Sequence, residues 1–163
     1  MRRALMMSLM TLLLTVWPLI TLAGTASETV DTAVQDRADN FWFGHRGRMS
    51  DVIRTITVVM QGSRFLPGTI DVKRGETIRF LVINRDPIAH EFVLGDVAEQ
   101  AAHEKEMASM PGMPMTDPNG VTVAPGKTGV FIWMFTQVGQ LQYACHLPGH
   151  YQDGMFGQLN IHD

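Results

Sequence analysis

Three metal-binding side chains of different chemistry lie close together near the C-terminal end of this 163-residue chain. Cys145 is the only cysteine, His150 follows it five positions later, and Met155 follows His150 after another five. The segment between them contains Pro148-Gly149, which is typical of a turn. A loop folded at this turn can bring a thiolate, an imidazole and a thioether to one point.

A second imidazole can come from His90, which follows the strand-breaking pair Asp86-Pro87 and opens the next apolar run. A thiolate, two imidazoles and a weak axial thioether form the ligand set of a type 1 copper site. We therefore predict that His90, Cys145, His150 and Met155 bind one copper ion.

Two other chemistries compete for the same residues. Zinc accepts thiolate and imidazole ligands, but it prefers four strong donors and a thioether is a poor one. A catalytic Cys145 thiolate with a histidine base would be a nucleophile. That interpretation leaves Met155 and the regular spacing of the loop unexplained, so copper is favoured.

The surrounding sequence adds a family resemblance over about residues 50–163. The stretches FLPGTIDVKRGETIRFLVINRDPIAHEFVLG and YACHLPGHYQDGMFGQL resemble the exported, plastocyanin-like cupredoxins associated with copper tolerance. The spacing of the second stretch is also similar to that of multicopper oxidases and copper nitrite reductases. The resemblance implies a Greek-key β-sandwich with copper near one end, held by His90, Cys145, His150 and Met155.

His146 stands next to the cysteine, where multicopper oxidases have a histidine that serves a trinuclear copper cluster. Such a cluster needs several His-x-His pairs, and the six histidines at 45, 90, 103, 146, 150 and 162 contain none. We therefore expect a protein that is not an enzyme. His146 is expected to face outward at a strand end rather than to support a ligand or an electron exit, and His45 and His162 are expected at the surface.

A second group of soft donors precedes the loop from Cys145 to Met155, which we call the copper loop. Its members lie within thirteen residues and are His103, Met107, Met110, Met113 and Met115. Thioethers prefer Cu(I), so this segment is a possible second copper site or a docking loop for copper delivery. The alternative is that these methionines fill gaps in the core, as methionine often does. Pro111 and Pro114 weaken that alternative, since they keep the later methionines off a helix face.

The N-terminus has the pattern of a secretory signal peptide. Arg2 and Arg3 precede an apolar run from Ala4 to Ala23, and the small residues Gly24-Thr25-Ala26 follow. We predict a signal peptide over residues 1–26, cleaved near Ala26, which places the mature protein in the periplasm without stable membrane insertion. An uncleaved membrane anchor is the alternative, because the apolar run is long enough to span a bilayer.

The rest of the sequence predicts the strands and the helix that must position the side chains of the predicted copper ligands. Residues 27–50 form a polar N-terminal segment that packs Phe41, Trp42 and Phe43 on the body. Residues 51–163 form the cupredoxin domain, with an insertion at about 96–120. Short alternating or β-branched runs separated by Gly and Pro turns predict strands at 52–59, 69–73, 76–84, 90–94, 121–124, 128–136, 140–145 and 156–161. Val97 to Met110 favours a short helix.

Composition excludes several other functions. The chain is 45% hydrophobic and has a net charge of -3, so it is neither disordered throughout nor basic enough to bind nucleic acid. We expect an all-β, exported type 1 copper protein that serves copper tolerance by binding copper or transferring electrons. A soluble electron carrier between a donor and a terminal oxidase or reductase is the alternative, with the redox partner unidentified.

Overall fold

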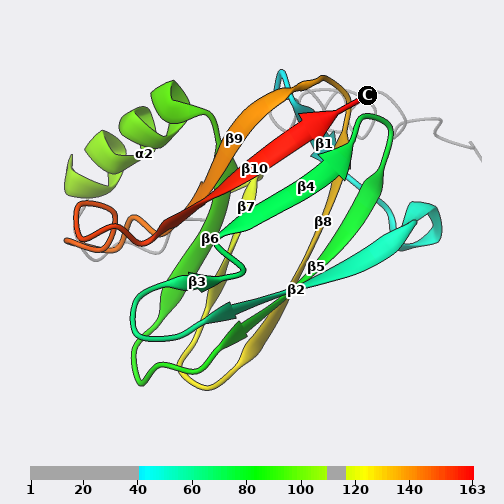
Figure 1. The fold of residues 1–163 in the computed structure, drawn as a ribbon. Coiled ribbons are helices and arrows are strands. Elements are labelled where there is room, and N and C mark those ends of the chain that lie inside the picture. The colour runs from blue at the N-terminus through cyan, green and yellow to red at the C-terminus, as the bar shows by residue number, and fades with distance from the viewer. Residues whose placement is uncertain (1–40, 110–116) are drawn as a thin grey trace, which may run out of the picture.

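Two sheets pack face to face in the computed structural model, which describes residues 41–109 and 117–163 (Figure 1). The strands are β1 Gly44–Arg46, β2 Arg54–Met60, β3 Phe65–Leu66, β4 Thr69–Lys73, β5 Thr77–Asn84, β6 His90–Gly95, β7 Gly120–Val123, β8 Thr128–Phe135, β9 Gly139–Ala144 and β10 Phe156–His162. The first sheet has the order β1-β8-β5-β2-β3 and the second has the order β4-β10-β9-β6-β7. The predicted all-β sandwich is confirmed.

The register of the second sheet places the predicted copper ligands at one end of the sandwich. Strand β6 pairs antiparallel with β9, and Val93 lies opposite Ala144. His90 is the first residue of β6, and it therefore lies close to Cys145, which follows the last residue of β9. Strand β10 pairs antiparallel with β9 from Phe156 onward, so it starts beside the same end.

An aromatic core fills the space between the sheets. Phe92 of β6 lies 5.2 Å from Phe80 of β5 and 5.3 Å from Tyr143 of β9, measured between ring centroids. All three side chains are fully buried, as are Phe131 and Trp133 of β8. Burying large aromatic side chains supplies much of the favourable free energy of folding, and it holds the strand ends that carry the ligands.

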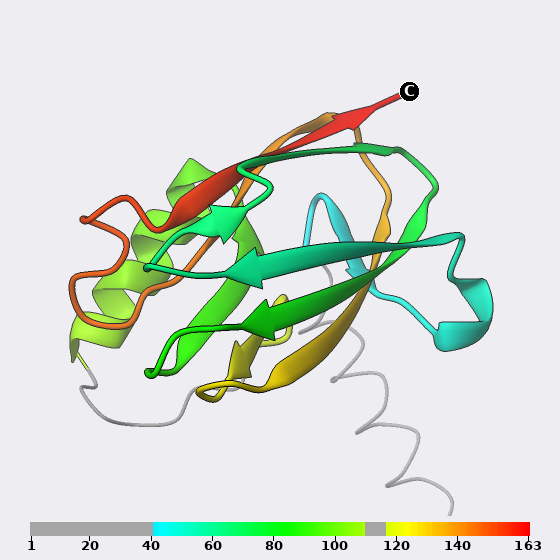
Figure 2. The same ribbon diagram turned by 60° about the horizontal axis from the view of Figure 1, so that its bottom comes forward.

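The single described α-helix, α2 (Val97–Ser109), covers the outer face of the second sheet beside the loop that follows β9 (Figure 2). Asp96 caps the helix, because its carboxylate accepts the N–H groups of Ala98 and Glu99 while Glu99 accepts the N–H of Asp96. Gln100 is the one fully buried side chain of the helix. The helix predicted from Val97 is confirmed over Val97–Ser109.

The N-terminal segment contributes to the sandwich where the structure describes it. Phe43 is buried 5.4 Å from Trp133, Phe41 is partly buried, and Trp42 donates its indole N–H to Asp96. Strand β1 extends the first sheet, and a 3₁₀ turn, η1 (Met49–Asp51), follows it. The predicted signal peptide lies outside the described residues. No helix among the described residues has the length and apolarity needed to cross a membrane.

Candidate metal centre

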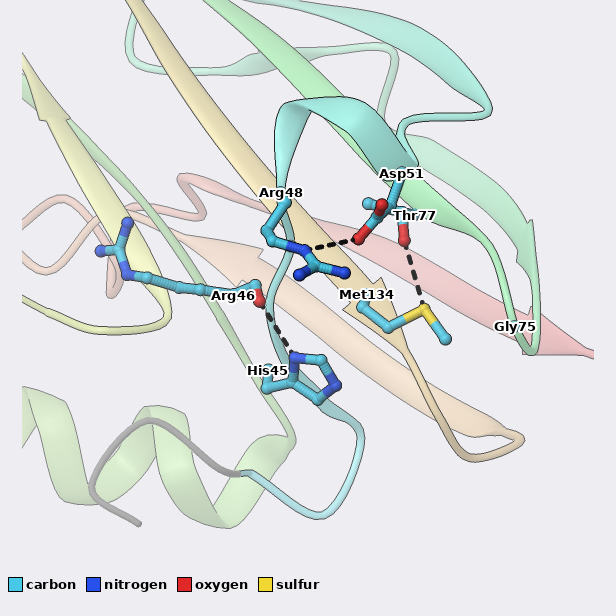
Figure 3. Close-up of a pocket in the computed structure, with 8 residues that line it drawn as sticks. His45, Arg46, Arg48, Asp51, Gly75, Thr77 and Met134 are labelled. Carbon is cyan, nitrogen blue, oxygen red and sulfur yellow. Dashed lines mark hydrogen bonds and ion pairs between the residues drawn. The ribbon is translucent and has the colours of Figure 1, made fainter. Parts of the chain in front are cut away.

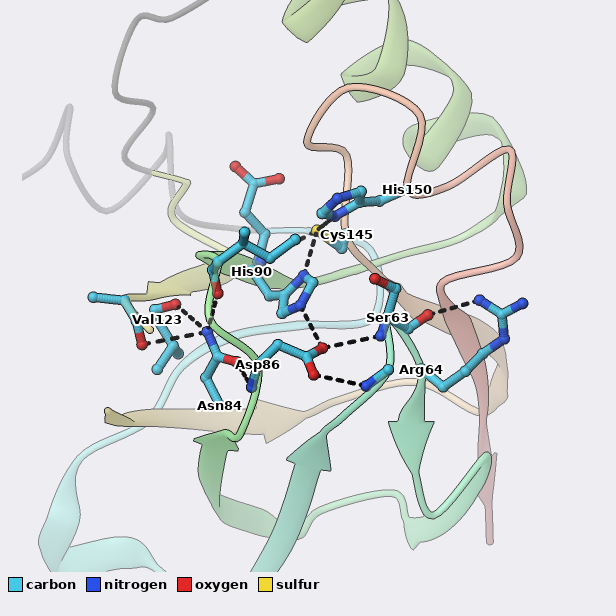
Figure 4. Close-up of polar contacts among 12 residues, drawn as sticks. Ser63, Arg64, Asn84, Asp86, His90, Val123, Cys145 and His150 are labelled. Atoms are coloured by element: carbon cyan, nitrogen blue, oxygen red, sulfur yellow. Dashed lines mark hydrogen bonds and ion pairs between the residues drawn. The ribbon is translucent and has the colours of Figure 1, made fainter. Parts of the chain in front are cut away.

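Strand β6 and the loop after β9, both in the second sheet, bring His90, Cys145 and His150 together at one end of the sandwich (Figure 4). The Sγ atom of Cys145 lies 3.2 Å from Nδ1 of His150 and 3.8 Å from Nδ1 of His90. The three donor atoms all lie within 4.8 Å of one another. Cys145 and His90 are fully buried and His150 is partly buried, so only one imidazole edge approaches solvent.

The loop after β9 brings Met155 back to the cysteine. The N–H of Cys145 donates to the carbonyl of Met155 at 3.2 Å, and the N–H of Met155 donates to the carbonyl of His150 at 2.9 Å. Gly149 and Gly154 both have φ of 87°, a conformation that glycine adopts without strain. The Met155 side chain is fully buried, and its backbone adjoins that of the cysteine.

A carboxylate fixes the orientation of the first imidazole. Oδ2 of Asp86 lies 2.8 Å from Nε2 of His90, and Asp86 also accepts the N–H groups of Gly62 and Ser63 (Figure 4). Burial acts to raise the pKa of Asp86, but these N–H groups and His90 hold it below its usual value. The ionised carboxylate keeps the proton on Nε2 and leaves Nδ1 as the donor that faces Cys145.

Burial raises the pKa of the Cys145 thiol to about 11, although the N–H of Glu91 donates to Sγ at 3.4 Å. Catalytic thiolates have lowered pKa values, so this environment opposes the nucleophile alternative. Burial also lowers the pKa of His150, which favours the neutral imidazole that metals bind. A soft cation would stabilise the thiolate here, and the donors therefore suit a metal.

The expectation that His146 faces outward is wrong. The residue is 2% exposed, because α2 covers the end of β9 from outside. Its Nε2 lies 2.6 Å from Oε1 of Gln100, and its Nδ1 contacts the carboxylate of Glu104. Burial lowers the pKa of His146, while the neighbouring Glu104 acts in the opposite direction. The side chain therefore joins the helix to the copper loop.

The residues of the predicted Cu(I) segment divide between two places. His103 lies on α2, and its Nδ1 is 3.6 Å from Oδ1 of Asp117. Met107 instead lines a pocket of about 320 Å³ with His146, Pro148 and other residues of the copper loop. Met110, Met113 and Met115 lie outside the described residues, so the proposed thioether cluster stays a prediction.

A wider pocket of about 580 Å³ lies away from the metal-binding side chains, around β1 and η1 (Figure 3). Several of its polar groups are paired, and Arg46 donates out of the pocket to the carbonyl of Asp117. Arg48 binds Asp51 at 3.0 Å, and the hydroxyl of Thr77 donates to the sulfur of Met134. This arrangement contains no activated nucleophile or acid–base pair, and we assign it no chemistry.

A two-sheet sandwich with a buried cysteine between two imidazoles at one end defines the class of copper-binding cupredoxins. The sequence matches the family described as copper binding proteins, plastocyanin/azurin family, over residues 55–162. The chain therefore belongs to that family and is a copper protein.

Individual relatives agree with this assignment. The copper-resistant cuproprotein CopI of Rubrivivax gelatinosus is 46% identical over 120 residues, which cover 73% of each chain. The protein of the same name from Pseudomonas aeruginosa is 37% identical over 148 residues, covering 73% of this chain and 82% of its own. The solved structure of auracyanin B has a TM-score of 0.63 at 22% identity and covers 74% of this chain and 97% of its own, which supports the fold.

Sequence reasoning missed two features around the metal-binding side chains. The sequence pattern marks Asp86 only as part of a strand break, although its spacing of four residues from His90 across a turn is compatible with a contact. The second is a group formed by Glu91, His103 and Asp117, whose donor atoms also lie within 4.8 Å of one another. These three residues come from separate elements, so only the folded structure places them together.

Proposed function

We propose that this chain is an exported type 1 copper protein that serves copper tolerance, with His90, Cys145 and His150 as strong ligands and Met155 as the weak axial one. The observation that carries the proposal is the buried Cys145 sulfur flanked by two imidazole Nδ1 atoms at 3.2 and 3.8 Å. The copper-resistance names of its relatives support the physiological role.

The residues around the ligands suit electron exchange. Asp86 holds the first imidazole, the N–H of Glu91 donates to the sulfur, and loop hydrogen bonds link His150 to Met155. Copper in such a site would exchange one electron between Cu(I) and Cu(II). Ligands held this firmly need little rearrangement on a change of charge, so electron transfer would be fast. The protein would bind copper and carry electrons rather than act as an enzyme.

Survival on copper tests the physiological role. Cells that lack this protein should grow poorly on elevated copper, and wild-type protein should restore their growth. Cys145→Ala should fail to restore it, whereas His45→Ala, at an exposed site on the opposite sheet, should restore it fully. Equal rescue by Cys145→Ala would contradict a role for the type 1 site in tolerance. It would favour the thioether segment as the protective element.

The alternative is a soluble electron carrier between a donor and a terminal oxidase or reductase. In that case, deletion should impair respiration at low copper as well as growth at high copper. A defect confined to high copper would support the tolerance function.

We also propose that the segment from His103 to Met115 binds Cu(I) through its methionines. The supporting observation is that Met107 lines the pocket beside Pro148 and Gly149 of the copper loop, so a thioether faces the neighbourhood of the type 1 ligands. Replacing Met107, Met110, Met113 and Met115 by Leu removes sulfur but keeps most of the apolar volume. Cu(I) titration of Cys145→Ala protein with and without these changes should show weaker binding in the Leu version. Equal binding would mean that the methionines are packing residues.

A further inference from the structure

A second group of metal-binding side chains lies under α2, outside the type 1 ligands. Glu91 comes from β6, His103 from α2, and Asp117 from the segment before β7. One donor atom of each lies within 4.8 Å of the other two. Glu91 is 2% exposed, and the side chains of His103 and Asp117 are 11% and 13% exposed.

The group is separate from the type 1 ligands because successive side chains of a strand point to opposite faces. His90 points toward Cys145, and the next residue, Glu91, points toward the helix side of the sheet. The same alternation separates Cys145 from His146, whose ring lies 4.8 Å from that of His103, centroid to centroid. The two sets of side chains are therefore neighbours that share strands but no ligand.

The charges of this group are poorly compensated within the described part of the chain. The Glu91 carboxylate accepts one hydrogen bond, from the N–H of His146 at 3.0 Å. Nε2 of His103 is buried and has no hydrogen-bond partner among the described residues. The Asp117 carboxylate lies 3.6 Å from Nδ1 of His103, and Arg46 donates to the backbone carbonyl of Asp117 at 2.9 Å rather than to its carboxylate.

Glu91 is almost fully buried, and the side chain of Asp117 is only 13% exposed, so two carboxylates lie together in an enclosed environment. Enclosed carboxylates are costly unless they are paired or coordinate a metal. A cation with two positive charges would offset both, and the lone pair of a neutral His103 would complete a three-residue ligand set.

We propose that Glu91, His103 and Asp117 bind a divalent transition-metal ion, with Cu(II) bound more tightly than Zn(II), at a second site beneath α2. One imidazole and two carboxylates suit such ions, and affinities for one site rise from Zn(II) to Cu(II). Cu(I) prefers sulfur ligands, so this site differs in chemistry from the methionine segment. Water would fill the remaining coordination positions.

Access to the site is available from the surface. A pocket of about 260 Å³ is lined by His103 and Asp117, and the carboxylates of Glu99 and Glu106 line the same pocket. Acidic side chains around an opening raise the local concentration of cations. A hydrated divalent ion can therefore reach His103 and Asp117 through this pocket.

Calorimetric titration of Zn(II) into protein loaded with one equivalent of copper tests the proposal, since that copper occupies the sulfur-containing site and Zn(II) does not compete well with it there. We expect one Zn(II) per chain, and at least tenfold weaker binding by His103→Ala and by Asp117→Asn. His162→Ala is the matched control, because that exposed histidine also lies beside a carboxylate, Asp71, and it should bind Zn(II) like the wild type. Absence of Zn(II) binding, or equal affinity in all four proteins, would overturn the proposal.

Electron paramagnetic resonance of the wild-type protein supplies a test that does not depend on how the variants fold. Cu(II) added beyond the first equivalent should give a second signal with the wide copper hyperfine splitting of nitrogen and oxygen ligands and with coupling to one imidazole. Additional Cu(II) that shows coupling to several imidazoles or none would contradict the assigned ligands. The calorimetric and the resonance measurements both follow the added ion and not the copper at the type 1 ligands. Failure of this proposal can therefore be distinguished from failure of the type 1 assignment.

Discussion

At the residue scale, two of the predicted copper ligands, His90 and Cys145, depend on neighbours that set their orientation or charge. His90 is held through Nε2 by Asp86, which is itself held by two backbone N–H groups from the loop between β2 and β3. Cys145 receives the N–H of Glu91, and its thiol is buried. These neighbours thus position the Nδ1 atom of His90 and the sulfur of Cys145 as donor atoms.

Loss of the Asp86 carboxylate should weaken copper binding. Asp86→Ala frees the His90 ring to rotate and to change its protonated nitrogen, and such supporting residues typically contribute about 10–100-fold in metal affinity. Competition with a copper chelator measures the change. Asp51→Ala removes a carboxylate from an exposed ion pair and serves as the control, with expected wild-type affinity. Wild-type affinity in Asp86→Ala would contradict the orienting role.

Met155 should control the reduction potential rather than copper retention. Met155→Gln replaces a soft thioether by a harder amide oxygen, which stabilises Cu(II) relative to Cu(I). We expect the variant to keep one copper per chain and to have a lower reduction potential, measured by redox titration. An unchanged potential would indicate that Met155 is a packing residue and not the axial ligand.

At the scale of elements, the sandwich brings strand ends together, and a polar contact supports the start of β2 in the first sheet. Arg54 of β2 binds both oxygens of Glu76, at 3.3 and 2.9 Å, and Glu76 also accepts the N–H of Lys73. These contacts join β2 to the turn between β4 and β5. Arg54 holds the pKa of Glu76 below its ordinary value of 4.5, although partial burial acts in the other direction.

The Arg54–Glu76 pair should therefore stabilise the fold in a pH-dependent way. A depressed carboxyl pKa contributes stability above the unfolded pKa, and that contribution is lost as pH falls through the folded pKa. A double-mutant cycle with Arg54→Gln and Glu76→Gln should give a coupling free energy of about 0.5–1 kcal/mol at neutral pH. Urea unfolding at decreasing pH should show the coupling vanish in acid, and a constant coupling would contradict this assignment.

The strands show how much of the fold is predictable from this sequence. Alternation and turn residues identified eight of them, because those runs are long enough for a period of two to show. Strands β1 and β3 have three and two residues, too few for any periodicity. The loop spacing predicted that Cys145 and His150 lie together, because they are five residues apart in one loop. The assignment of Met155 as axial ligand stays a prediction.

The surroundings of α2 were not predictable, for a physical reason. Its inward-facing side chains include the polar residues Gln100, His103 and Glu104, so no apolar stripe marks the buried face. A helix of this kind is positioned by hydrogen bonds to β6 and β9, which only the folded chain reveals. The burial of His146 and the grouping of Glu91, His103 and Asp117 follow from that placement.

At the scale of the whole molecule, we propose an exported copper carrier with its redox site at one end of a rigid sandwich. Export should leave a mature N-terminus close to Ser27, in the soluble periplasmic fraction. Intact-mass measurement of protein purified from its native compartment checks this prediction. A mass that includes Met1, or retention in the membrane fraction, would favour an uncleaved anchor.

The central claim is that one copper ion binds at Cys145 between His90 and His150. Visible absorption of the purified, oxidised, copper-loaded protein tests it most directly, alongside the same measurement on Cys145→Ser. We predict one copper per chain and an intense visible band from thiolate-to-Cu(II) charge transfer, and we predict that Cys145→Ser, which keeps the size of the side chain but removes the sulfur, lacks the band. A Cys145→Ser protein that keeps the band, or a wild-type protein that binds copper without it, would contradict the claim.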